Sequence, residues 1–160
     1  MDIEARLAAL GLTLPPPVVI APHIRLPFAF VRVSGDRAYI SGHAPVDSDG
    51  RVARPLGKVG SDLTAEQGYQ AARLTTLSIL GSLQRTLGDL DRVTSWLRIF
   101  GMVNAAPGFN ELPTVINGCS DLILELYGAE RGAHARSAVG LAELPFNIPV
   151  EIEAEVAIAI

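Results

Sequence analysis

The chain has 160 residues, enough to bury a hydrophobic core as one domain, and a net charge of −4. Its lysine and arginine residues are scattered without a cluster, which argues against nucleic acid as a partner, because phosphate neutralisation needs a concentrated basic face. A single cysteine excludes an internal disulfide and argues against a thiolate metal site, and no apolar run reaches the length of a membrane span.

Composition also bears on assembly and location. With 49% hydrophobic and only 19% charged residues, we expect part of the apolar surface to be buried between copies of the chain. Asp2 and Glu4 stand where a signal peptide would be basic, so a cytoplasmic protein is expected.

The first third of the chain predicts one helix and one hairpin. Residues 2–10 form an amphipathic pattern with Ile3, Leu7 and Leu10 on one stripe, and the three prolines at 15–17 force an extended connection. Two strands are expected at 28–33 and 37–41, because the turn residues 34–36 separate them. Residues 45–60 are predicted to be a loop.

Two long helices and three strands follow. Asp62 or Thr64 can cap a helix that ends at Gly88, and a second helix is expected from Asn110 to Gly128, with the lone cysteine on its apolar stripe. Cys119 is therefore interpreted as a core residue. The expected strands are 93–103, 136–142 and 150–160.

This order of elements predicts an α+β fold with a single mixed sheet and two helices packed on one face. The short first helix cannot cover the other face of the sheet, so neighbouring subunits are expected to do so.

The last strand carries the strongest functional pattern. Apolar residues occupy the even positions from 150 to 160, while Glu151, Glu153 and Glu155 occupy one opposite face. Arg136 and Glu151 together could bind a carboxylate and activate water, although a structural salt bridge is the commoner role of such a pair. For Glu153 and Glu155 an ordinary solvated strand face is the better interpretation.

Several segments resemble the Rid (reactive intermediate deaminase) or YjgF family. They are AYISGHAP at 38–45, RS at 136–137, LP at 144–145 and VEIEA at 150–154. The resemblance spans residues 18–160 and follows an N-terminal helical extension and proline-rich connection at 1–17. It implies a chorismate-mutase-like fold that assembles as a homotrimer, with a site in each cleft between subunits.

The resemblance also implies roles for individual residues. Arg136 takes the position of the arginine that binds the substrate carboxylate, Glu151 that of the glutamate associated with the attacking water, and Gly42 that of a backbone which approaches the ligand. Ala138 stands where archetypal members have cysteine, so only its N–H can contact a ligand. The resemblance matches the remaining residues less directly. Asn117 lies on the helix that carries a family asparagine. The aromatic residue that lines the family pocket corresponds to Phe28 or Phe30, neither of which has a tyrosine hydroxyl.

His43 replaces the glutamine of the family turn. An imidazole titrates near neutral pH and could shuttle protons there, while a half-exposed turn histidine without a role is the alternative. The other histidines, His23 and His134, do not fall at metal-ligand spacing with it, so no metal site is predicted.

The implied reaction is hydrolysis of 2-imino or enamine acids to 2-keto acids and ammonia, which requires no metal or organic cofactor. The expected partner is therefore a small carboxylate-bearing substrate, with neither nucleic acid nor a membrane. A related hydrolase of small carboxylates is a variant of this hypothesis. The competing hypothesis is a trimeric small-carboxylate binding or chaperone-like module without activity, and an endoribonuclease role ranks third because the chain is acidic.

Overall fold

The computed structural model describes residues 2–160, and its elements follow the predicted order. The helices and strands have the following bounds: α1 Ile3–Ala9, β1 Val31–Ser34, β2 Arg37–His43, α2 Ala65–Leu87, η1 Leu90–Arg92, β3 Val93–Asn104, α3 Leu112–Arg131, β4 Ala135–Leu141, η2 Pro145–Asn147 and β5 Val150–Ile158.

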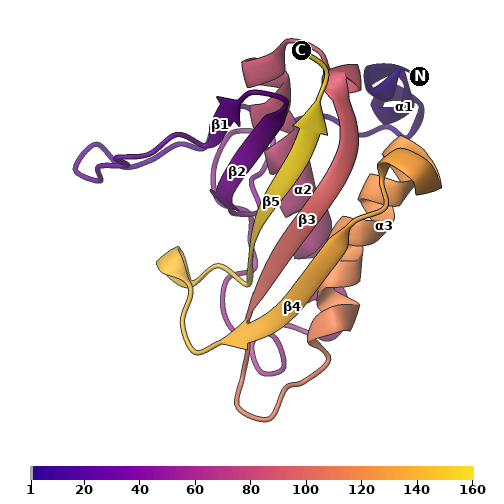
Figure 1. Cartoon of the computed structure of the whole chain (residues 1–160). Coiled ribbons are helices and arrows are strands. Elements are labelled where there is room, and N and C mark those ends of the chain that lie inside the picture. Colours follow the sequence, from indigo (N-terminus) through magenta and orange to yellow (C-terminus); the bar gives the residue numbers. More distant parts are fainter. Residues whose placement is uncertain (1) are drawn as a thin grey trace.

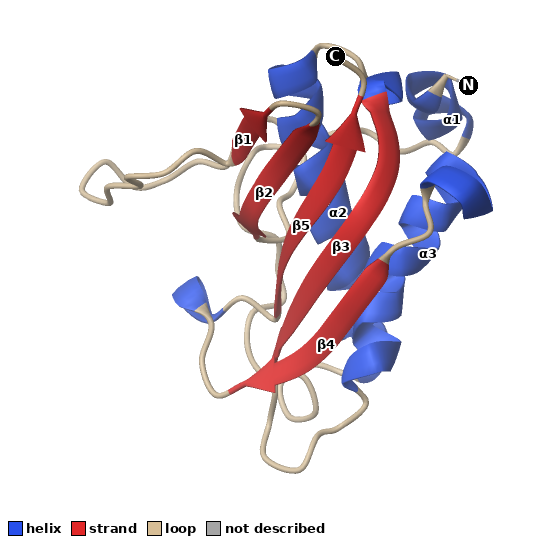
Figure 2. Cartoon of the chain, in the orientation of Figure 1, coloured by secondary structure: helices blue, strands red, loops and turns tan. Residues whose placement is uncertain are grey.

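The five strands form one open sheet in the order β1-β2-β5-β3-β4. Only the β3–β4 pair is parallel, and α3 provides the crossover between these two strands. Both long helices lie behind the sheet in the view of Figure 2, and its front face carries no helix. The predicted fold class, one mixed sheet with two helices on one face, is confirmed.

Helix α2 begins and ends as its sequence predicts. The side chain of Thr64 accepts a hydrogen bond from the Gln67 backbone N–H, and the Gln67 side-chain oxygen accepts one from the Thr64 N–H, which completes a capping box. Gly88 ends the helix in the left-handed conformation. Because Ile79, Leu80 and Leu83 are fully buried, this helix supplies much of the core that positions the sheet.

Helix α3 extends slightly beyond its expected end. Gly128 leaves the helical conformation (φ 74°, ψ 173°), yet a further turn follows and closes at Gly132. The helix is therefore interrupted at Gly128, where the sequence predicts its end, and a separate helical turn that the sequence analysis did not predict extends it to Arg131. Cys119 is fully buried on this helix, as predicted, and burial raises the pKa of its thiol to about 12.

The hairpin is shorter on one side than predicted. β1 starts at Val31 instead of Phe28, while β2 continues to His43, where the sequence suggested a turn. Residues 15–30 instead contain no helix or strand; this segment starts at the buried Pro15 and forms an arm that projects from the body of the molecule beside β1 (Figure 1). Proline-rich segments favour such irregular backbone, since proline cannot donate to a sheet.

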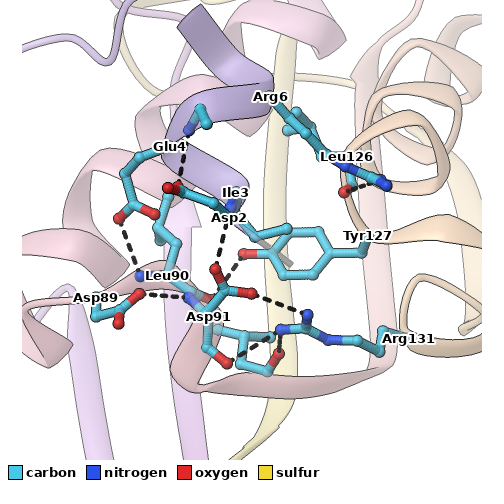
Figure 3. A network of polar contacts seen from close by, with 12 residues as sticks. Asp2, Ile3, Glu4, Arg6, Asp89, Leu90, Asp91, Leu126, Tyr127 and Arg131 are labelled. Atoms are coloured by element: carbon cyan, nitrogen blue, oxygen red, sulfur yellow. Dashed lines mark hydrogen bonds and ion pairs between the residues drawn. The ribbon is translucent and has the colours of Figure 1, made fainter.

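The N-terminal helix is fixed to η1 by polar contacts (Figure 3). The backbone N–H of Ile3 donates to Asp91 at 3.1 Å, and Glu4 accepts from the N–H of Leu90 at 3.1 Å. Arg131 from the end of α3 pairs with Asp91 at 3.0 Å. These contacts hold the first helix against the body of the molecule through both backbone and charged groups.

Two boundaries of the terminal elements differ from the prediction. Ile3 and Leu7 are buried as expected, but Leu10 lies after the end of α1 and is 42% exposed, so it does not belong to the apolar stripe. The last strand ends at Ile158 and leaves Ile160 exposed. Within residues 2–160 no helix combines the length and the apolar character needed to span a membrane.

Candidate functional site

The three glutamates of β5 differ in their partners on the open face of the sheet. Glu155 pairs with Arg37 at 2.5 Å, and Glu153 lies 3.6 Å from Arg98. Glu151 has no arginine or lysine within ion-pair distance in the part of the chain that the structure describes. Arg37 and Arg98 therefore pair with Glu155 and Glu153, and the Glu151 carboxylate is left available for a ligand.

Glu151 lies directly against Gly42. A Cβ atom at position 42 would stand only 2.1 Å from Oε1 of Glu151, so any other residue there would displace this carboxylate. The register of β2 against β5 shifts between Ile40 and His43, which places Gly42 in a bulge. The absence of a side chain thus allows the carboxylate to lie beside the strand at this point.

Glu151 also lines a cavity of about 770 Å³ between the arm and the end of β2. Five predicted site residues border this cavity, namely Phe28, Phe30, Gly42, His43 and Glu151. Most of the other lining residues are apolar, and among the described lining residues Glu151 is the only carboxylate. Burial, and secondarily the neighbouring charge of Glu153, raises the pKa of Glu151 above its ordinary value.

His43 is not the half-exposed turn residue that the sequence suggested. It is 5% exposed and lies on the helix-facing side of the sheet. Nδ1 lies 2.6 Å from the carbonyl oxygen of Ser41, which can only accept, so Nδ1 carries the proton and Nε2 accepts from the Ser82 hydroxyl at 2.9 Å. The ring is therefore held as the neutral tautomer.

The expectation that His43 titrates near neutral pH is also wrong. Burial, together with the positive charge of Arg85, lowers its pKa to about 4, although the hydrogen bond to Ser41 acts in the opposite direction. At neutral pH this imidazole is therefore uncharged, and both of its ring nitrogens are engaged in hydrogen bonds within the chain.

Two aromatic rings separate His43 from solvent. Phe28 and Phe30 meet edge to face with centroids 5.5 Å apart, and Phe30 lies 5.1 Å from the His43 ring. Phe28 is 51% exposed and Phe30 is half-buried. Both predicted aromatic positions therefore line the cavity, and they give it an apolar wall without a hydroxyl group.

The other predicted residues lie at a different edge of the molecule. Arg136 and Ala138 are on β4, three strands away from β2, a distance of about 14 Å at ordinary strand spacing. Arg136 faces α3, where Nη1 donates to the Ser120 hydroxyl at 2.9 Å and Nη2 to the carbonyl of Pro113 at 3.3 Å. Asn117 is exposed on the same helix between these two contacts.

A single chain therefore does not bring Arg136 and Glu151 together. Arg136 pairs with Ile99 in β3 and shares its helix-facing side, whereas Glu151 pairs with Met102 on the open face. The pairing of these two residues that the sequence suggested is not a salt bridge within the chain.

Comparisons with known proteins agree with this architecture. Residues 4–152 match the family model described as "YjgF/chorismate mutase-like, putative endoribonuclease". This chain belongs to the YjgF/chorismate mutase-like family.

Other proteins are similar to nearly the whole of this chain. Protein TCP17 of Trypanosoma cruzi is 39% identical over 152 residues, which cover 95% of this chain and 91% of that protein. The structure of Atu1372 from Agrobacterium tumefaciens is 39% identical in sequence, with a TM-score of 0.86. The match covers 98% of this chain and 94% of the Atu1372 chain. A structure from Shewanella oneidensis named a "putative endoribonuclease" is 30% identical, with a TM-score of 0.88. The match covers 99% of this chain and 100% of the Shewanella chain.

One residue of this YjgF-family pocket was missed by the sequence analysis. Arg85, in the last turn of α2, lines the cavity that contains His43 and Glu151. A basic residue in the last turn of a helix is usually assigned to the helix dipole, so nothing in the local pattern distinguishes it. Only the packing of α2 against the end of β2 brings this guanidinium to the pocket.

Proposed function

We propose that this protein is a cofactor-free hydrolase that converts 2-imino or enamine acids to 2-keto acids and ammonia. The observation that carries the proposal is the state of Glu151. It is the one carboxylate among the described lining residues of an apolar cavity, it lacks a cationic partner among the described residues, and its pKa is raised. Such a carboxyl group is a suitable general base and acid.

The reaction needs little more than positioning and one proton-transfer group. As the water oxygen bonds to the imine carbon, Glu151 takes a proton from that water and the C=N electron pair moves to nitrogen. Glu151 then passes this proton to the nitrogen, which gives a neutral carbinolamine and returns Glu151 to its charged form. Glu151 next takes the hydroxyl proton of the carbinolamine and delivers it to the nitrogen as the C–N bond breaks, so that the 2-keto acid forms and ammonia leaves. The apolar walls exclude bulk water from the remaining surface of the substrate.

The substrate carboxylate would be bound by Arg136 of a neighbouring subunit in a homotrimer. Arg136 uses two donors in its contacts with Ser120 and Pro113, and a guanidinium has five. The helix-free face of the sheet, which includes the half-buried Phe100 and Met102, is the surface on which subunits would associate. Light scattering at micromolar concentration tests this assembly, and a monomer would contradict it.

Imine hydrolysis is tested with an imine generated in situ from an amino acid by an oxidase, with ammonia release as the readout. We expect Glu151→Gln to lower turnover by about 10²- to 10⁴-fold, the usual contribution of a positioned general base. Affinity for the carboxylate should change little, because Arg136 still binds the ground state. Glu155→Gln is the matched control, since it lies on the same strand face and pairs with Arg37.

Two results would contradict this mechanism. If Arg136→Ala hydrolysed the imine at the wild-type rate, Arg136 would not bind the substrate. If Glu151→Gln retained turnover but dissociated the oligomer, the carboxylate would be a structural partner at the subunit interface.

A binding module without catalytic activity is the second candidate. Its support is the apolar aromatic wall of Phe28 and Phe30 and the neutral, buried His43, which leave few polar groups in the cavity. Calorimetry with 2-ketobutyrate and benzoate, combined with the ammonia assay, separates the two. Saturable binding without turnover of any imine would favour the module. The endoribonuclease named for relatives has less support, because one arginine in an apolar cavity does not provide a track for phosphates.

A further inference from the structure

Among the described lining residues the pocket contains one cation, Arg85, which the proposed reaction does not use. The Arg85 guanidinium donates from Nη1 to the carbonyl of Pro15 at 3.2 Å and from Nη2 to the Ser82 hydroxyl at 3.0 Å. Both acceptors are neutral, and no carboxylate within the described residues forms an ion pair with Arg85. A guanidinium with free donors beside an apolar cavity is suited to binding an anion.

The orientation of Arg85 is fixed by its surroundings. Ser82 Oγ accepts from Arg85 and donates to His43 Nε2, while His43 Nδ1 donates to the Ser41 carbonyl. A Cβ atom at Gly81 would lie 3.1 Å from both Nη1 of Arg85 and the Pro15 carbonyl oxygen, so the glycine leaves room for this contact. The guanidinium is therefore preorganised by a continuous chain of hydrogen bonds.

The surroundings of Arg136 repeat this arrangement at the other edge of the sheet. Arg136 donates to the Ser120 hydroxyl and to a proline carbonyl, as Arg85 does. Ser120 in turn contacts Nε2 of His134 at 2.9 Å, and Nδ1 of His134 lies 2.7 Å from the carbonyl of Gly132, two residues earlier in the chain. The fold thus holds two arginines by the same serine, histidine and proline contacts.

The position of Arg85 relative to Glu151 indicates where a second anionic group would bind. Glu151 reaches the cavity from the open face of the sheet, whereas His43 and the Arg85 contacts lie on the helix-facing side. A cavity of about 770 Å³ is much larger than a short-chain imino acid needs, and it falls in the range that accommodates drug-sized ligands. Apolar residues such as Ile24, Phe28 and Ile148 line it, beside the two charged residues.

We propose that Arg85 binds a second anionic group of the substrate, so that the substrate class is acids that carry two anionic groups on a bulky apolar body. This inference rests on the proposed function in one respect, namely that Arg136 of a neighbouring subunit binds the first carboxylate. Arg85 then determines specificity, and Glu151 remains the group that acts on the reacting carbon.

The experiment compares two acids that share one apolar body. 2-Phenylglutarate is 4-phenylbutyrate with one additional carboxylate, and both are titrated calorimetrically into the wild-type protein and its variants. We expect the wild type to bind the diacid at least about tenfold more tightly, the scale of one charge-assisted hydrogen-bonded contact. Arg85→Gln should reduce this ratio to near one. Arg73→Gln is the matched control on the same helix, because Arg73 pairs with Glu125 and does not line the cavity.

Further variants keep the interpretation unambiguous. Arg85→Lys retains a cation without the planar fork, and the ratio should fall part of the way. Arg136→Gln should lower the affinity for both acids by a similar factor and leave the ratio of the two affinities unchanged. A wild-type protein that binds neither acid, or both equally, overturns the role of Arg85, as does an unchanged ratio in Arg85→Gln. If Arg136→Gln lowers the affinity for neither acid, Arg136 does not bind the substrate carboxylate as the proposed function requires. The ratio of the two affinities still decides the role of Arg85.

Discussion

Burial of His43 makes the stability of this protein depend on pH in a defined window. Its pKa is lowered from 6.5 to about 4, mainly because the charged imidazolium is excluded from water. Between these values the unfolded chain binds a proton that the folded chain does not bind. The contribution to stability is therefore complete above pH 6.5 and is lost as the pH falls toward 4.

The difference in pKa sets the size of the effect. At 1.36 kcal/mol for each pKa unit, the shift of His43 corresponds to about 3 kcal/mol of unfolding free energy across the window. His43→Gln removes the titrating ring and retains a side chain that can form hydrogen bonds. Relative to wild type, this variant should lose about 3 kcal/mol less stability as the pH falls through the same window.

Urea unfolding measured by Trp96 fluorescence provides the assay, because Trp96 is the only tryptophan and is 1% exposed in the folded chain. His23→Gln is the matched control, since the same replacement is made at an exposed imidazole. All measurements use one protein concentration, so that subunit association does not alter the comparison. If wild type and His43→Gln lose stability equally through the window, the folded protein protonates His43 and the reasoning from burial is refuted.

Three smaller perturbations test the fold itself. Gly101→Ala should lower the unfolding free energy by about 1–3 kcal/mol in urea, because a Cβ would lie 2.6 Å from Ile116; a wild-type midpoint would show that the β3–α3 contact is looser than described. Thr64→Ala should cost about 1 kcal/mol through loss of the hydrogen bond to the Gln67 backbone, and an unchanged midpoint would contradict the capping box. Cys119 should react with a thiol reagent only after unfolding, since burial raises its pKa to about 12, and rapid labelling of the folded protein would contradict this.

The sequence by itself determined the features that depend on neighbouring residues. The capping box at Thr64 and the glycine at position 88 set the bounds of α2, because both act through hydrogen bonds within a few residues. The alternation of β5 identified its buried and charged faces, since side chains along a strand point to opposite sides. Gly42 and Glu151 were identified by resemblance, and the structure places them in contact.

Only the tertiary structure decided which of these residues share a site. The parallel pairing of β4 with β3 places Arg136 against α3 and away from Glu151, and neither residue's own segment encodes that separation. The burial that lowers the pKa of His43 comes from helix α2 and from the arm, which are distant in sequence. Arg85 likewise becomes a pocket residue through packing alone. Charge and burial depend on what surrounds a group in space, so the chemistry of these residues is set by contacts between segments that no local pattern contains.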